Sequence, residues 1–247
     1  MSPASLVRVW DAVWDGPVIP DFDEPDCRAN ERFCWSWVVD NWPDLQARLV
    51  EHIYITAIAV GIGLMIAVSA ALLAYRYNRF ETPFVTVSTV LYTVPVLAFL
   101  LVMVQITGIG LLTVEIALTG YTLLLLFRNT LTGLRSVPPE VHAAAAGMGM
   151  TSGQILFRIN IPLALPALMA GIRVASVTII SLATLAAFVS PLGLGRPILF
   201  AIGTQFVTGL IAAGALAIIL ALVADGLLVL ATRAVTPWIP AGQGGIR

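Results

Sequence analysis

The stretch Pro138–Pro166 reads PPEVHAAAAGMGMTSGQILFRINIPLALP, and it lies between two long apolar segments. It is the longest part of the second half of the chain that is not itself a candidate membrane span. The alanine run predicts a short helix over residues 143–149, because alanine has the highest intrinsic helix propensity. Gly147 and Gly149 weaken this helix and let another backbone come close.

A second short helix is expected directly after the glycines. Thr151 or Ser152 can cap it, and it carries Gln154. Pro162 and Pro166 are then expected to stop this helix and redirect the chain into the next apolar segment. The stretch is thus predicted to be an exposed loop of two helices, in which Met148 offers a flexible apolar contact to a partner.

The composition around this loop is that of a membrane protein. The 247 residues are 59% hydrophobic and 11% charged, with a mean hydropathy of +0.94, whereas soluble domains carry about 25% charged residues. Several nearly uncharged runs exceed the ~18 residues that indicate a membrane-spanning helix. We therefore predict an all-α polytopic membrane protein. Its net charge of −1 favours no nucleic-acid partner.

The apolar runs predict five transmembrane helices, over Ile53–Tyr75, Phe84–Ile106, Leu111–Phe127, Leu165–Val189 and Gly209–Ala231. Pro95 interrupts the second of them and should kink it, freeing a carbonyl near Leu91. Kinked helices often line pathways, so Tyr92, Thr93 and Pro95 are candidates for a translocation path, with a plain packing kink as the alternative. Phe188 is a further candidate, as part of an outer gate with the residues from Ser190 to Gly195.

Arginine placement predicts the orientation. Segments 76–83, 128–165 and 232–247 hold seven arginines, and the alternating segments 107–110 and 190–208 hold one. By the positive-inside rule the first set is cytoplasmic. We expect an acidic, Trp-containing extracytoplasmic tail over 1–47, a transmembrane domain over 48–237 with the loop at 138–166, and a cytoplasmic tail over 238–247. Outside the cytoplasm Cys27 and Cys34 could pair; two free thiols are the alternative.

Charged residues within the spans are few. Asp225 lies in the fifth span, where a carboxylate costs about 2.5–3.5 kcal/mol at mid-membrane, so it needs a partner. Arg173 in the fourth span is the favoured one, and a proton or cation relay is the alternative. Glu115 is expected to be solvated near the outer face. His52 and His142 are expected at a surface or an interface.

The chain contains no nucleotide-binding sequence of the form GxxxxGK[ST]. Any ATP hydrolysis coupled to it must therefore occur on another chain. We expect no catalysis, cofactor or metal site on this one.

The spacing within the loop resembles a known pattern. Ala143-Ala144-Ala145 is followed after three residues by Gly149 and, after nine more, by Ile159-Asn160-Ile161-Pro162. This resembles the EAA motif of permease subunits of binding-protein-dependent ABC importers. Two positions depart from it: Ala143 replaces a glutamate that in the family helps to hold the coupling helix on the ATPase, and Ile161 replaces a leucine. A second, different permease subunit could then make the stronger contact.

The resemblance is closer to the glycine betaine/carnitine/choline (osmoprotectant) branch of these permeases. It rests on Tyr92-Thr93-Val94-Pro95, FRNTLTGL (127–134), GMGMTSGQILFRINIPLALPALMAGIR (147–173) and LATLAAFVSPLGLG (182–195), and it extends over residues 49–237.

The resemblance implies a type I ABC importer permease (MetI-like) core with a cytoplasmic coupling helix in the cell membrane. It implies two ATPase subunits that bind ATP and Mg²⁺, a second permease subunit that is identical or homologous, and an extracytoplasmic substrate-binding protein. The solute would be a quaternary ammonium osmoprotectant. The residues implied for ATPase coupling are Ala143, Ala144, Ala145, Gly147, Met148, Gly149, Gln154 and Pro162.

Four alternatives remain at this point. The chain could be a permease of the same architecture for an amino acid or another small solute. It could be a self-contained secondary carrier that uses Asp225 and Glu115, or a membrane scaffold without transport. The loop itself could be an interfacial hairpin without a partner.

Overall fold

The computed structural model describes residues 33–238, and every regular element within that range is helical. Cys27 and most of both predicted tails lie outside these residues. The elements are α2 (Trp35–Asp40), α3 (Trp42–Arg76), η2 (Asn78–Phe80), α4 (Glu81–Thr93), α5 (Val96–Thr107), α6 (Leu111–Arg135), α7 (Pro139–Gly147), α8 (Ser152–Ile155), η3 (Leu156–Asn160), α9 (Ile161–Ala186), α10 (Gly195–Thr204) and α11 (Val207–Val235).

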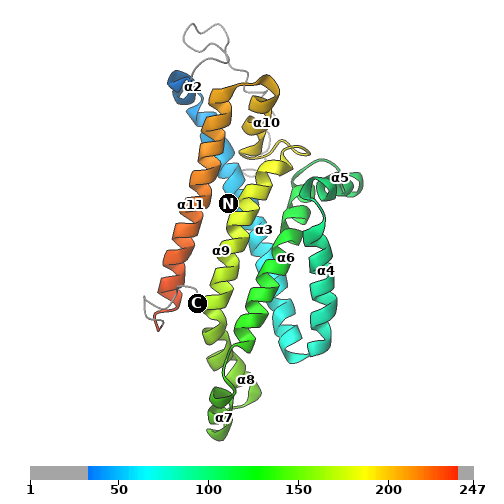
Figure 1. Ribbon diagram of the computed structural model, residues 1–247, viewed down its shortest axis with the longest axis vertical. Coiled ribbons are helices and arrows are strands. Elements are labelled where there is room, and N and C mark those ends of the chain that lie inside the picture. The colour runs from blue at the N-terminus through cyan, green and yellow to red at the C-terminus, as the bar shows by residue number, and fades with distance from the viewer. Residues whose placement is uncertain (1–32, 239–247) are drawn as a thin grey trace, which may run out of the picture.

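Four long helices, α3, α6, α9 and α11, run along the length of the molecule (Figure 1). Each is long and apolar enough to cross a membrane, and the bent pair formed by α4 and α5 would raise the number of spans to five. This confirms the predicted all-α, polytopic class. The α6 helix lies at the centre, where it packs against α3, α4, α5 and α9.

Small side chains let the central helices approach one another. Ala67, Ala71 and Ala74 on α3 are completely buried, and they pack in one cluster with Leu126 and Phe127 of α6. Their spacing of three and four residues places them on one face of α3. Association of membrane helices depends on such close packing, because lipid offers no hydrophobic driving force between helices.

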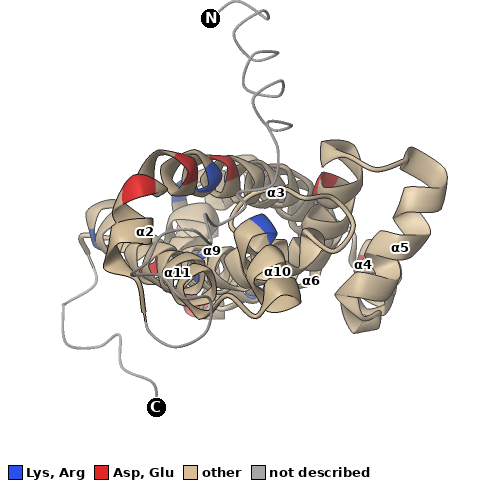
Figure 2. Cartoon of the chain, turned by 90° about the horizontal axis from the view of Figure 1, so that it is seen from above, with Lys and Arg blue, Asp and Glu red and all other residues tan. Residues whose placement is uncertain are grey.

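The predicted second span is not one kinked helix. The α4 helix ends at Thr93, α5 begins at Val96, and the two axes differ by 102°. A residue before proline is disfavoured in the helical region, and Val94 accordingly takes an extended conformation, with ψ of 130°. Figure 2 shows α4 and α5 standing to one side of the bundle.

The predicted stop after the second loop helix is also wrong. Residues Ser152–Ala186 form one continuous helical rod made of α8, η3 and α9. Pro162 lies in the first turn of α9, and Pro166 lies inside it. Directly before them, η3 is a π-helical turn. In a π-helical turn each carbonyl accepts from the N–H five residues later, instead of four. The hydrogen-bond pattern therefore shifts directly before Pro162, and the helix tolerates the missing N–H of this proline.

Three further spans begin or end at other residues than predicted. The α3 helix starts well before Ile53, and α6 continues past Phe127 to Arg135. The fourth span ends at Ala186, and the connection that follows it contains the additional helix α10. Together α2, α10 and the start of α11 close the end of the bundle opposite α7 and α8 (Figure 1).

Candidate functional site

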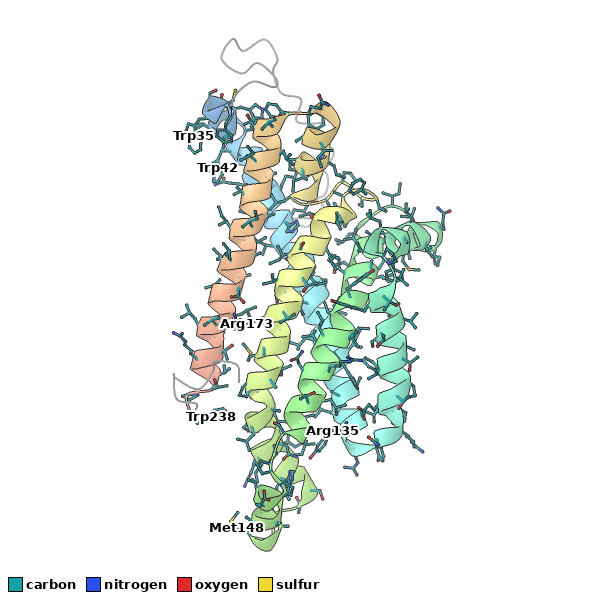
Figure 3. All side chains as sticks on the ribbon, in the orientation of Figure 1. Trp35, Trp42, Arg135, Met148, Arg173 and Trp238 are labelled. Atoms are coloured by element: carbon teal, nitrogen blue, oxygen red, sulfur yellow. The ribbon has the colours of Figure 1, made fainter. Side chains whose placement is uncertain are left out.

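The α7–α8 loop projects beyond the other helices at one end of the molecule, and Met148 lies at its tip (Figure 3). Met148 is 74% exposed, and Phe157, on the adjoining π-helical turn, is 68% exposed. Large apolar side chains that are exposed together mark a contact surface for a partner or a membrane. We call residues 139–160 the coupling loop and this end of the bundle the loop end.

Local sequence explains the shape of the coupling loop. Pro139 starts α7, where a missing N–H has no cost, so this helix begins earlier than the predicted residue 143. Gly149 ends it with a φ of +77°, a conformation that favours glycine. Thr151 caps α8 as predicted: its hydroxyl accepts from the Gln154 N–H at 3.3 Å, and its own N–H donates to Gln154 Oε1 at 2.8 Å.

The residues predicted for ATPase coupling do not all face outward. Ala145 is completely buried, and Pro162 is half-buried in the first turn of α9. The other predicted residues are exposed around the two helices: Ala143, Ala144, Gly147, Met148, Gly149 and Gln154. The surface available to a partner is therefore one face of α7 together with the glycine turn.

A chain of hydrogen bonds ties the coupling loop to α3. His142 Nε2 donates to Asn160 Oδ1 at 2.8 Å, and Asn160 Nδ2 donates to the Tyr75 hydroxyl at 2.8 Å. Asn160 is 2% exposed, so its amide depends on these partners. His142 thus joins the loop to a transmembrane helix. The sequence signal for Asn160 was a lone polar residue within Ile-Asn-Ile-Pro.

A second tie at the loop end joins α6 to α4. Arg135, the last residue of α6, donates to both carboxylate oxygens of Glu81 at 3.0 and 2.7 Å. It also donates to Asn78 Oδ1 at 2.8 Å. This clamp holds the turn between α3 and α4 beside the segment that enters the coupling loop.

At the opposite end, α3 holds the segment that follows α9. His52 is completely buried inside the bundle, so the predicted position at a surface or an interface is wrong. Its Nε2 donates to the Ile180 carbonyl at 3.0 Å, and its Nδ1 accepts from the Leu194 N–H at 3.3 Å, which fits a neutral imidazole. Glu51 Oε2 accepts from the Gly193 N–H at 2.8 Å.

The two charged residues predicted within the spans meet as expected. Arg173 on α9 and Asp225 on α11 form an ion pair with two hydrogen bonds of 2.8 Å. Both side chains keep more than a third of their surface exposed. Figure 3 shows Arg173 far from either end of the molecule.

Glu115 is buried, at 8% exposure, so the predicted solvated position is wrong. Neither carboxylate oxygen has a hydrogen-bond partner among the described residues. The cause is the position of α6 at the centre of the bundle, which a one-dimensional hydropathy pattern does not reveal. No group of three His, Cys, Asp or Glu side chains within residues 33–238 is arranged to hold a metal ion.

The residues predicted for the translocation path lie around the break at Pro95. Tyr92 and Pro95 are exposed, and the Tyr92 ring lies 5.9 Å from that of Tyr121. The Tyr121 hydroxyl donates to the Val94 carbonyl, which the break leaves without a helical donor. The Thr93 hydroxyl donates to the Val90 carbonyl, one turn earlier on α4, at 2.9 Å. Phe188 is 59% exposed just after α9, and its place in a path stays a prediction.

Residues 48–237 match the family described as "Binding-protein-dependent transport system inner membrane component". The chain belongs to this family. The permease is also similar to curated relatives over most of their length. It is 36% identical to the osmoprotectant import permease protein OsmW of Salmonella typhimurium, with 78% of this chain and 92% of the relative covered.

Two relatives from Bacillus subtilis show similar coverage. The choline transport system permease protein OpuBB is 33% identical, over 80% of this permease and 91% of the relative. The glycine betaine/carnitine/choline transport system permease protein OpuCB is 32% identical, over 82% and 93%.

Solved structures share the fold. The MetNI methionine ABC transporter in an inward-facing conformation superposes with a TM-score of 0.67, at 22% identity, over 78% of this permease and 96% of that chain. An amino acid ABC transporter solved with histidines gives a TM-score of 0.64 at 18% identity, over 83% and 100%. At these identities the likeness concerns the fold alone.

Proposed function

We propose that this permease is the membrane-spanning subunit of an ABC importer that brings a quaternary ammonium osmoprotectant into the cell. Glycine betaine, choline and carnitine are the candidate solutes, because these compounds are named for the curated relatives. ATP hydrolysis takes place on separate ATPase subunits, which also hold the nucleotide and its Mg²⁺. A second permease subunit and an extracytoplasmic binding protein complete the importer.

The observation that carries this proposal is the exposed tip of the coupling loop. Met148 stands at the end of a helix pair that extends past the transmembrane helices (Figure 3), and its side chain is 74% exposed. An ATPase groove that receives Met148 and the exposed alanines of α7 would bury this apolar surface. Force applied there acts on α9 directly, because α8 continues into it.

The proposal includes an orientation. The loop end faces the cytoplasm, where ATP is available, and the end with α2 and α10 faces the outside. The arginine distribution supports this by the positive-inside rule. Among residues 52–238, the segments 76–83, 128–165 and 232–238, which lie towards the loop end, hold six of the eight arginines.

The test is purification of the tagged permease in mild detergent with its ATPase subunit, followed by reconstitution with the binding protein. Met148→Asp should abolish co-purification of the ATPase, because a carboxylate would be buried in an apolar contact. The matched control is Ile202→Asp, an equally drastic change at a 56% exposed apolar residue on α10. It should leave co-purification intact.

Uptake then identifies the solute. The reconstituted importer should accumulate labelled glycine betaine, choline or carnitine only when ATP is supplied. Accumulation that amino acids inhibit, while the three quaternary ammonium compounds do not, would establish the alternative solute class. A permease that transports without any ATPase would contradict the proposal and leave a self-contained carrier.

A further inference from the structure

A cavity of about 280 Å³ lies at the loop end, between the last turn of α3 and the coupling loop. Tyr75 and Arg76 line it from α3, His142 from α7 and Ser152 from the start of α8. Its volume is close to the lower limit of about 300 Å³ that is usual for ligand pockets. Arg76 and Ser152 are exposed, so a ligand can reach the cavity from the surface.

Three side chains that line the cavity can donate hydrogen bonds to a ligand. The Tyr75 hydroxyl accepts from Asn160 Nδ2, so its own hydrogen can be donated. The Ser152 hydroxyl takes no part in the capping box of α8. Arg76 uses its Nε for the Tyr77 hydroxyl, at 3.2 Å, which among the described residues leaves both terminal nitrogens for a ligand. None of the residues that line the cavity is acidic, so these donors favour an anion.

Positive charge is concentrated beside the cavity. The guanidinium carbons of Arg76 and Arg79 lie 5.5 and 5.9 Å from the centroid of the Tyr77 ring, so the two cations share one ring. Neither arginine forms an ion pair with a carboxylate within residues 33–238. Two neighbouring cations without a counter-charge attract an anion, and the planar fork of arginine matches the oxygens of a phosphate group.

The cavity lies at a level where exposed aromatic side chains gather. Tyr77 and Phe80 are exposed in the turn after α3, and Trp238 is exposed after α11. Figure 3 shows Trp238 at a height similar to that of Arg135, which bonds to Asn78 in the same turn. Aromatic side chains of this kind mark the interface between membrane and water. Basic pockets between membrane helices at that depth bind anionic headgroups.

We infer that this cavity binds a phosphate group, whose oxygens accept hydrogen bonds from Arg76, Ser152 and Tyr75. The group belongs either to an anionic phospholipid at the membrane surface or to a soluble phosphate compound. Ile155 and Leu156 are half-buried and give the cavity an apolar side. This side suits the glycerol and acyl part of a lipid.

A bound phosphate group would join the end of α3 to the start of the helical rod that continues into α9. This contact would act beside the hydrogen bonds of Tyr75, Asn160 and His142, so the ligand would help to hold the coupling loop against α3. The inference goes beyond the proposed transport function and does not depend on it, because it requires neither an ATPase nor a transported solute.

The first experiment titrates phosphatidylglycerol into the full-length permease in a neutral detergent and counts the bound lipid by native mass spectrometry. We expect one molecule to bind per chain before any others. Arg76→Gln should weaken this binding about tenfold, because it removes the charge-assisted hydrogen bonds. The matched control is Arg158→Gln, at an exposed arginine of the coupling loop that does not line the cavity, and it should bind as the unaltered chain does. Ser152→Ala is a second variant that should weaken binding and leaves the cap of α8 intact.

Equilibrium dialysis with radiolabelled inorganic phosphate, on the same variants, separates the two sources of the group. Saturable phosphate binding that is lost in Arg76→Gln would identify a soluble compound, and the same result with phosphatidylglycerol alone would identify a lipid headgroup. If neither ligand binds saturably, or if Arg76→Gln and Ser152→Ala leave binding unchanged, the inference is overturned. Neither assay contains the ATPase, so such a failure leaves the transport proposal standing.

Discussion

Arg173 on α9 and Asp225 on α11 form a two-point ion pair, in which Arg173 Nε and Nη2 each donate to a separate carboxylate oxygen at 2.8 Å. A bidentate arginine–carboxylate pair fixes geometry as well as charge. The pair therefore sets both the rotation and the height of α11 against α9. This matters because α11 packs mainly on α9 and α10 and has few other neighbours.

Asp225→Asn should lower the thermal unfolding temperature of the purified permease and reduce ATP-driven uptake, because it leaves the Arg173 guanidinium without a counter-charge. The exchange of both residues, Arg173→Asp with Asp225→Arg, restores a pair of the same composition. It should recover much of both losses. If the exchanged protein is stable yet inactive, the pair has its structural role but transport also needs a carboxylate at position 225, as a proton or cation relay would. If the exchange recovers neither stability nor uptake, the structural role of the pair is refuted. Differential scanning fluorimetry and vesicle uptake measure the two quantities.

Tyr75→Phe removes one hydroxyl from the chain that joins His142, Asn160 and α3. It leaves a buried amide N–H without an acceptor, at a cost of about 1–3 kcal/mol. We expect the ATPase to remain bound while solute-stimulated ATP hydrolysis falls, since the loop is no longer tied to α3. The control is Tyr54→Phe, at an exposed tyrosine on the same helix. Equal stimulation in both variants would show that the hydrogen bonds only stabilise the fold.

Gly193→Ala should destabilise the permease. Gly193 has a φ of +58°, and an added Cβ would lie 2.7 Å from His52 Nδ1. The backbone strain alone costs on the order of 1–3 kcal/mol, and the contact adds to it. Gly203→Ala in α10 meets nothing within 4 Å and should be neutral or stabilise by up to about 1 kcal/mol. Thermal unfolding of both variants checks this order, and equal unfolding temperatures would contradict it.

Thr151→Ala removes the side-chain cap of α8. The expected cost is about 1 kcal/mol, which corresponds to a roughly fivefold faster amide exchange at Gln154. Hydrogen exchange followed by mass spectrometry measures the exchange rate in the peptide that contains Gln154. Ser152→Ala is the control, because the Ser152 hydroxyl takes no part in the capping box. Exchange that is unchanged in Thr151→Ala would mean that packing, and not the cap, holds the loop.

The sequence was sufficient to predict most of the helices and the coupling loop. In lipid, the backbone N–H and C=O groups of a long apolar run must bond to one another, which a single segment achieves as an α-helix. The helical state of these runs therefore follows from their composition. The capping box at Thr151 and Gln154 is equally local, since both residues lie within one turn. The Arg173–Asp225 pair was predictable because few charges occur within the spans, which leaves little choice of partner.

Features that depend on how the helices pack against one another could not be predicted from the sequence. The angle at Pro95 is set by α5 packing across α6, and hydropathy carries no information about it. The π-helical turn before Pro162 absorbs a proline that by itself predicts a stop. Glu115 and His52 appeared exposed because each stands near the end of an apolar run, whereas the folded bundle surrounds both.

The helical segment from Ser152 to Ala186 is unbroken, so a tilt imposed at one end would be carried to the other. At 1.5 Å per residue its 35 residues measure about 52 Å. If the segment pivoted near its middle, a displacement of about 3 Å at the Ser152 end would tilt it by roughly 7° and move the Ala186 end about 3 Å in the opposite direction. Beyond Ala186, the Gly193 and Leu194 N–H groups donate to Glu51 and His52 of α3. The displacement would therefore act on a segment that is held against α3.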